Sequence, residues 1–182
     1  EDANIEDKTL LVETVSSESV AVIMVTYHTG EALWASIDAV LEQSGVDQLI
    51  LVDNGNPQSV VADLMQLRDK HRHVQLITGH GNIGFAAGCN LGAAKADADL
   101  LLFLNPDCLL EPHALAEAKK AFTAYPDALM AGCHLLNADG SEQRGGRRRL
   151  LTPMNGFSES LGLYRLGVGD RLNQHRESML QS

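Results

Sequence analysis

The stretch Asp99-Leu100-Leu101-Leu102-Phe103-Leu104-Asn105-Pro106-Asp107 places a carboxylate at the end of an apolar run that predicts a buried strand. A second such run, Leu49 to Val52, ends at Asp53-Asn54-Gly55, and a third, Val20 to Val25, ends at Thr26-Tyr27-His28. Ligands of α/β proteins bind outside the carboxyl ends of the strands. Three polar strand ends on one sheet edge therefore indicate a site there.

Composition narrows the class of protein. A chain of 182 residues with 45% hydrophobic content can bury the core of one main domain. The formal net charge of -10 argues against a nucleic-acid partner, because phosphate binding needs clustered Lys and Arg. The three cysteines share no CxxC spacing, which predicts neither a disulfide framework nor a zinc site and favours a reducing cytosol. No apolar stretch approaches the roughly 18 residues of a membrane span, so no transmembrane segment is expected.

Apolar runs alternate with helix-period segments from Val20 onward, which predicts an α/β fold: a mainly parallel sheet with crossover helices on both faces. The acidic, polar residues 1–19 are expected to form a flexible leader, and the pattern breaks down after Gly140. The predicted strands are Val20–Tyr27, Gln48–Asp53, Val74–Thr78, Asp99–Leu104 and Ala128–Leu136, and the predicted helices are Glu31–Gln43, one from Pro57 through Leu67, Phe85–Ala96 and Glu111–Ala124.

The loop Gly79-His80-Gly81-Asn82-Ile83-Gly84 matches the dinucleotide pattern GxGxxG. It follows the third predicted strand, and the acidic residues at the required distance, Asp97 and Asp99, precede the next strand, whereas a dinucleotide fold has its acidic residue at a strand end. A better explanation is that Gly81, Gly84 and Gly88 let the backbone approach a ligand or a neighbouring helix closely. Tight packing alone remains the alternative.

Asp107 is a candidate metal ligand. Pro106 fixes the direction in which the chain leaves the strand, so the carboxylate is positioned. Mg²⁺ or Mn²⁺ commonly takes one or two protein carboxylates and completes its shell with substrate phosphates and water. The alternative is a carboxylate that only caps a turn, a role that is also common for the Asp of Asp53-Asn54-Gly55.

Four blocks together resemble the family 2 glycosyltransferases, and most closely their bacterial rhamnosyltransferase-like branch. The blocks are Val22 to Tyr27, Leu51 to Gly55, Gly81 to Asn90 and Leu102 to Asp107. The resemblance covers about Val20 to Arg149 and implies a GT-A fold, in which a Rossmann-like nucleotide-binding half, here residues 20–140, precedes an acceptor half. Residues 141–182 are then expected to be the start of an incomplete acceptor-side region.

The resemblance also implies roles for individual residues. Thr26 and Tyr27 would border the base, Asp53 would hydrogen-bond it, and Asn105 and Asp107 occupy the metal-binding Asp-x-Asp position of the family, with Asp107 holding the divalent cation. The full set implied at the nucleotide is Thr26, Tyr27, Asp53, Asn54, Asn82, Gly84, Asn90, Asn105 and Asp107.

The function that this resemblance implies is inverting transfer of a hexose, with rhamnose favoured, from a dTDP- or UDP-sugar. The acceptor would be a saccharide or a lipid-linked molecule of cell-surface polysaccharide synthesis, which implies a cytoplasmic protein working at the inner membrane face. The sequence names no catalytic base: Glu142, Glu159, Asp170 and Glu177 are isolated, and an acidic motif like the family's is missing after Gly140. A binding module without turnover and, behind it, an NAD-binding oxidoreductase remain alternatives, and a homo-oligomer is left open.

Overall fold

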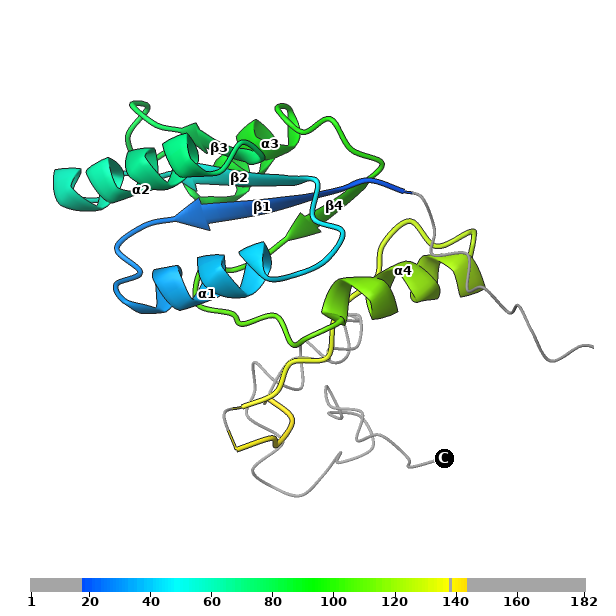
Figure 1. Ribbon diagram of the computed structural model, residues 1–182. Helices are drawn as coiled ribbons and strands as arrows, with labels where there is room; N and C mark the ends of the chain where they lie inside the picture. The colour runs from blue at the N-terminus through cyan, green and yellow to red at the C-terminus, as the bar shows by residue number, and fades with distance from the viewer. Residues whose placement is uncertain (1–17, 138, 144–182) are drawn as a thin grey trace, which may run out of the picture. The chain divides into compact units, whose positions relative to one another are not determined.

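The computed structural model describes residues 18–137 and 139–143, which fall into two compact units, one ending at Ala131 and the other beginning at Gly132. All named elements belong to the first unit (Figure 1). In chain order they are β1 (Val20–Thr26), α1 (Ala32–Leu41), β2 (Gln48–Asp53), α2 (Gln58–Lys70), β3 (Val74–Ile77), α3 (Phe85–Ala93), β4 (Leu100–Phe103) and α4 (Ala114–Ala124).

The four strands form one parallel sheet in the order β3-β2-β1-β4. The chain moves outward from β1 to β2 and β3, and then returns to the other side of β1 to add β4. The strand order therefore reverses between β1 and β4, which is the topological switch point where open parallel sheets bind ligands. The predicted α/β class and the parallel sheet are confirmed.

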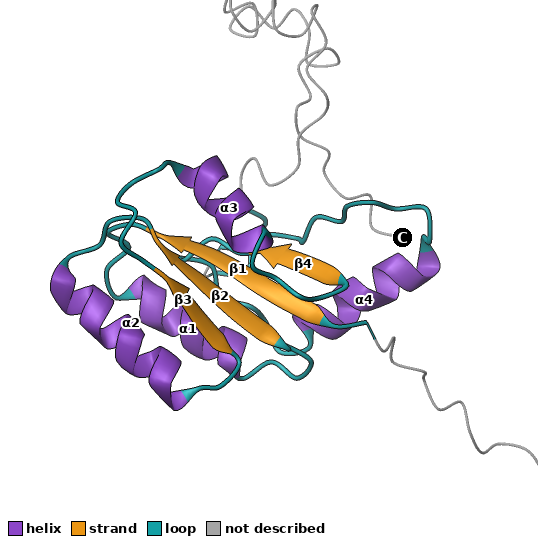
Figure 2. Cartoon of the chain, turned by 90° about the horizontal axis from the view of Figure 1, so that it is seen from above, coloured by secondary structure: helices purple, strands orange, loops and turns teal. Residues whose placement is uncertain are grey.

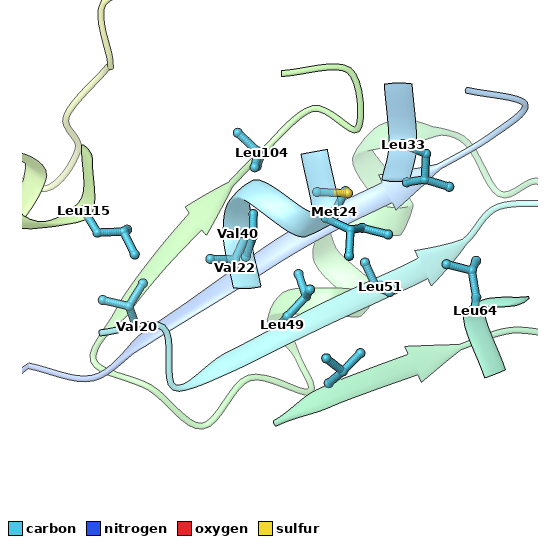
Figure 3. Packing of buried hydrophobic residues seen from close by; sticks show 12 residues of the cluster. Val20, Val22, Met24, Leu33, Val40, Leu49, Leu51, Leu64, Leu104 and Leu115 are labelled. Carbon is cyan, nitrogen blue, oxygen red and sulfur yellow. The ribbon is translucent and has the colours of Figure 1, made fainter. Parts of the chain in front are cut away.

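One face of the sheet packs against α1, α2 and α4. Alternate side chains of β1, among them Val22 and Met24, join Leu49 and Leu51 of β2 on this face (Figure 3). The three helices contribute Leu33, Ile37, Val40, Leu64 and Leu115. Full burial of one such side chain stabilises the fold by about 1.5–3 kcal/mol, so this cluster anchors the sheet.

The opposite face packs against α3, so helices cover both faces as predicted (Figure 2). Gly88 and Gly92 of α3 lie directly over β1: a Cβ at Gly88 would be 2.9 Å from Cγ1 of Val25, and one at Gly92 would be 2.5 Å from Cγ2 of Ile23. Gly88 thus serves close packing on a strand. Gly81 and Gly84 have positive φ and no atom within 4 Å of an added Cβ, so their backbone conformation, not packing, favours glycine.

The predicted fifth strand at 128–136 is wrong. The segment forms no strand, and its one bridge is a local antiparallel pairing of Leu136 with Glu142. Leu129 is fully exposed and Met130 is 87% exposed, so these apolar side chains do not pack on the sheet. An apolar run becomes a strand only when a neighbouring strand accepts its hydrogen bonds. The turn predicted at Asn137 to Gly140 is confirmed by the hydrogen bond from Gly140 N to Asn137 O.

The other predicted boundaries differ by a few residues. The fourth helix begins at Ala114 and not at Glu111, because His113 before it has a left-handed backbone with φ of 69°. The third helix stops at Ala93 and not at Ala96, where the chain tightens into turns. Among the described residues, none of the helices has both the length and the apolar character to cross a membrane.

Candidate functional site

The carboxyl ends of β2, β1 and β4 lie side by side at one edge of the sheet. Thr26 of β1 is in register with Asp53 of β2, and Leu104, just after β4, donates its N–H to Ile23 of β1. Neighbouring strands are about 4.8 Å apart, so the tips of β2 and β4 are separated by roughly 10 Å across β1. This edge brings together the three polar strand ends that the sequence singles out.

Asp53 is the centre of a buried hydrogen-bond network. It is only 4% exposed. Its Oδ2 accepts from the Thr78 hydroxyl at 2.6 Å, and its Oδ1 accepts from the backbone N–H of Gly55 at 3.2 Å and of Asn56 at 2.9 Å. Burial raises the pKa of the Asp53 carboxyl, but these hydrogen bonds together outweigh burial and hold the pKa below its usual value. Asp53 is therefore an ionised group that ties the end of β2 to Thr78, the residue after β3.

Asn56 joins the ends of β1 and β2. Its Nδ2 lies 2.8 Å from Oδ1 of Asp53, 2.7 Å from Oγ1 of Thr26 and 3.0 Å from the Thr26 carbonyl oxygen. Its Oδ1 accepts the backbone N–H of His28 at 2.8 Å, a residue with φ of 50°. Asn56 thus holds both the strand tips and the first turn after β1, next to the half-exposed ring of Tyr27.

Asn54 joins the end of β2 to the glycine loop. Its side chain is 3% exposed, and its Nδ2 donates to Oδ1 of Asn82 at 3.1 Å while its Oδ1 accepts the backbone N–H of Ile83 at 2.9 Å. The same oxygen of Asn82 also accepts the N–H of Gly84 at 2.9 Å. The loop before α3 is therefore held to β2 by side chains and by its own Asx turn.

The loop after β4 carries the exposed side chains of Asn105 and Asp107. The carbonyl of Asn105 accepts the N–H of Cys108 at 3.1 Å, closing a tight turn around Pro106. The buried hydroxyl of Ser36 in α1 donates to the Cys108 carbonyl, which fixes this turn on the helix layer. The backbone of the loop is anchored and its carboxylate faces solvent.

The side chains at this edge supply only part of the coordination shell of a divalent cation, and a bound diphosphate would complete it. Among residues 18–137 and 139–143, no group of three or more His, Cys, Asp or Glu side chains could hold a metal. Asp107 offers an exposed carboxylate and Asn105 an amide oxygen, which are hard oxygen donors of the kind that Mg²⁺ and Mn²⁺ prefer. Two such donors leave several coordination positions for the oxygens of a diphosphate.

The implied site residues fall into two groups. Thr26, Asp53 and Asn54 are buried and hydrogen-bonded within the protein. The remaining ones are exposed: Tyr27, Asn82, Gly84, Asn105 and Asp107 in the loops at the carboxyl edge, and Asn90 within α3. Sequence reasoning missed Asn56 and Thr78, whose only signals are polar side chains three residues after Asp53 and directly after β3.

The candidate bases are only partly described. Glu142 lies 3.7 Å from the His134 ring and belongs to the second compact unit. Glu159, Asp170 and Glu177 lie outside the described residues. By contrast, Asp97 and Asp99, the acidic residues that a dinucleotide reading would use, precede β4 at the amino edge of the sheet. There Asp99 accepts the N–H and hydroxyl of Ser19.

Comparison with known proteins identifies the family of the chain. The model of the family "Glycosyl transferase family 2" matches residues 21–174. An uncharacterised glycosyltransferase of Haemophilus influenzae is 33% identical over 89 residues, which are 48% of this chain and 36% of that protein. The chain thus spans about a third of the length of this relative.

Solved structures support the fold. A mannosyltransferase from Pyrobaculum calidifontis, solved with GDP-Man and Mn²⁺, aligns over 66% of this chain and 36% of its own, with a TM-score of 0.56 and 18% identity. Residues 1–349 of TarS from S. aureus align over 59% of this chain and 33% of their own, with a TM-score of 0.52 and 16% identity. The sheet with its switch point resembles these GT-A enzymes, and the family model covers most of the chain. This chain belongs to glycosyl transferase family 2.

Proposed function

We propose that the chain binds a nucleoside-diphosphate sugar at the carboxyl edge of the sheet and belongs to a glycosyltransferase that moves the sugar to a saccharide or lipid-linked acceptor. The observation that carries this proposal is the exposed Asp107 carboxylate at the end of β4, beside the switch point and across β1 from the glycine loop. Family membership and the GT-A fold support it. The ligands bound in the structure of the Pyrobaculum enzyme, GDP-Man and Mn²⁺, support a donor of this chemical class.

Different residues of the proposed site would bind different parts of the sugar nucleotide. Asp107, with Asn105, would hold a divalent cation on the diphosphate, and that cation would neutralise charge on the departing nucleoside diphosphate. The exposed ring of Tyr27 would border the base, while Asn82, Gly84 and Asn90 would line the nucleotide site. Thr26, Asp53 and Asn54 act beneath this surface, since hydrogen bonds inside the protein use their side chains.

The finer assignment follows the rhamnosyltransferase-like resemblance. A dTDP- or UDP-linked hexose, with rhamnose favoured, would be the donor, and the product would enter a cell-surface polysaccharide made at the inner face of the membrane. An inverting displacement needs a carboxylate to take the proton of the acceptor hydroxyl. We expect that base in the acceptor half of the enzyme, downstream of Asp107.

Calorimetry tests the donor site. UDP, dTDP and NAD are titrated into the chain with and without Mn²⁺, and then into the variants Asp107→Ala and Asp97→Ala. We expect Mn²⁺-dependent binding of a nucleoside diphosphate, lost in Asp107→Ala and kept in Asp97→Ala, which removes an exposed carboxylate at the amino edge. Binding that survives Asp107→Ala refutes the role of this carboxylate, and binding of NAD alone would favour a dinucleotide site.

A turnover assay separates a transferase from a binding module. The protein is incubated with Mn²⁺ and the sugar nucleotide that binds most tightly, and release of nucleoside diphosphate is followed with and without candidate acceptors. Acceptor-dependent release supports the transferase. Tight binding without hydrolysis or transfer would favour the binding module.

A further inference from the structure

The amide of Asn82 has a fixed orientation in this structure. Its Oδ1 receives two hydrogen bonds, from the Gly84 backbone N–H at 2.9 Å and from Nδ2 of Asn54 at 3.1 Å. A backbone N–H can only donate, so the atom that faces Gly84 must be the oxygen. The Asn82 side chain therefore turns its NH₂ group away from these partners.

The orientation of Asn54 is fixed by the same reasoning. Its Oδ1 accepts the backbone N–H of Ile83 at 2.9 Å, so its NH₂ group must face Asn82. Asn54 is 3% exposed, which leaves its amide no solvent to turn toward. Two backbone donors thus determine the direction of both amides.

The NH₂ group of Asn82 remains available. Asn82 is exposed, and within the described part of the chain its Nδ2 makes no hydrogen bond. It lies in the loop that precedes α3 at the carboxyl edge of the sheet. Asn82 thus presents only a donor, its NH₂ group, because its Oδ1 already accepts two hydrogen bonds.

From this geometry we infer that Asn82 is a specificity-determining residue, whose outward NH₂ group binds only ligand groups that offer an acceptor atom, and that Asn54 is a positioning residue that supports this orientation together with the Gly84 N–H. The inference rests on the proposed nucleotide site. Two parts of a nucleotide offer such oxygens, the diphosphate and a carbonyl of the base. A donor opposite C4 of the base would favour the carbonyl of uracil or thymine over the amino group of cytosine.

The sharpest variant is Asn82→Asp. Its carboxylate can still accept from Asn54 and from Gly84, so the loop keeps both hydrogen bonds, but the outward donor becomes an acceptor. We expect calorimetry with UDP and Mn²⁺ to show about tenfold weaker binding for Asn82→Ala, the size of one lost hydrogen bond, and a larger loss for Asn82→Asp. A role limited to holding the loop predicts the reverse order, since alanine removes the loop contacts.

Asn54→Asp tests the positioning role. The new carboxylate would still accept from Ile83, but it would set an oxygen against Oδ1 of Asn82, which the Gly84 N–H holds in place, and so displace the Asn82 side chain. UDP binding should weaken in the wild-type background and be unaffected by the same change in an Asn82→Ala background. Equal weakening in both backgrounds would overturn the positioning role.

The ligand and the variants separate the remaining outcomes. Loss of discrimination between UDP and CDP in Asn82→Ala places the donor opposite C4 of the base, and equal weakening of both places it at the diphosphate or at the C2 carbonyl, which both bases share. UDP binding to Asn82→Asp as tight as to the wild type overturns the inference while the proposed function stands. If the unmodified chain binds no nucleoside diphosphate, the proposed function itself is refuted.

Discussion

Replacing Gly92 with alanine should destabilise the fold. The added Cβ would lie 2.5 Å from Cγ2 of Ile23 and 3.3 Å from Cγ2 of Val52. Carbon atoms pack at about 3.5–4.0 Å, so the first contact is short by roughly 1 Å. Ile23 is 1% exposed in β1, which β2 and β4 hold on both sides, so the strand has little room to move.

The expected change in the free energy of unfolding is the sum of two opposing contributions. Overpacking a core costs about 1–3 kcal/mol, and the rigid position of β1 favours the upper end of that range. Alanine in place of glycine inside a helix returns about 1 kcal/mol. The net loss in the free energy of unfolding is therefore about 2 kcal/mol. With a urea dependence of about 2 kcal/mol per molar, the unfolding midpoint should fall by about 1 M.

Urea unfolding followed by circular dichroism measures the effect. Ala87→Gly, at an exposed position of the same helix, measures the helix-propensity term separately. Ile23→Ala should cost less free energy in the Gly92→Ala background than in the wild type, because it removes the clashing methyl group. A midpoint for Gly92→Ala equal to or above that of the wild type would refute the close approach of α3 to β1.

Two further predictions concern titratable groups. Because hydrogen bonds lower the folded-state pKa of Asp53 below its unfolded value, its ionised form stabilises the fold above about pH 4, and that contribution disappears as the pH falls through the folded pKa. Urea midpoints should therefore show a gap between wild type and Asp53→Asn at pH 6 that narrows at pH 3, and a constant gap would contradict this. The exposed thiol of Cys133 should be alkylated at pH 8 before those of Cys89 and Cys108, as read by mass spectrometry. Burial raises the pKa of both slower thiols, and the Asp107 charge also raises that of Cys108. Faster labelling of Cys108 than of Cys133 would be the contrary result.

The sheet was predictable because its signals are local. Each strand is an apolar run that ends at a polar residue, and β2 was predicted with its observed bounds, Gln48–Asp53. The segment at 128–136 carries a similar apolar signal but forms no strand, because pairing depends on a partner that its own residues do not specify. Local pattern therefore identifies candidate strands, and the sheet decides which of them pair.

The candidate site was predictable as a place but not as a set of contacts. The family resemblance implies nucleotide-binding roles for Asp53 and Asn54, and the structure adds that both side chains are buried and hydrogen-bonded within the protein. Asn56 reads as an ordinary turn residue and connects two strand tips. Such roles depend on how side chains from segments far apart in the sequence point toward one another. The spacing of residues along the chain does not specify these directions.

The central position of β1 has a consequence for synthesis of the chain. Val20 of β1 pairs with Leu100 of β4. One side of β1 therefore stays unpaired until a segment 80 residues downstream has been synthesised. Ribosomes add roughly 5–20 residues per second, which makes that delay about 4–16 s. During those seconds β1, an interior strand of the finished sheet, has one unpaired edge that can pair with another chain until β4 forms.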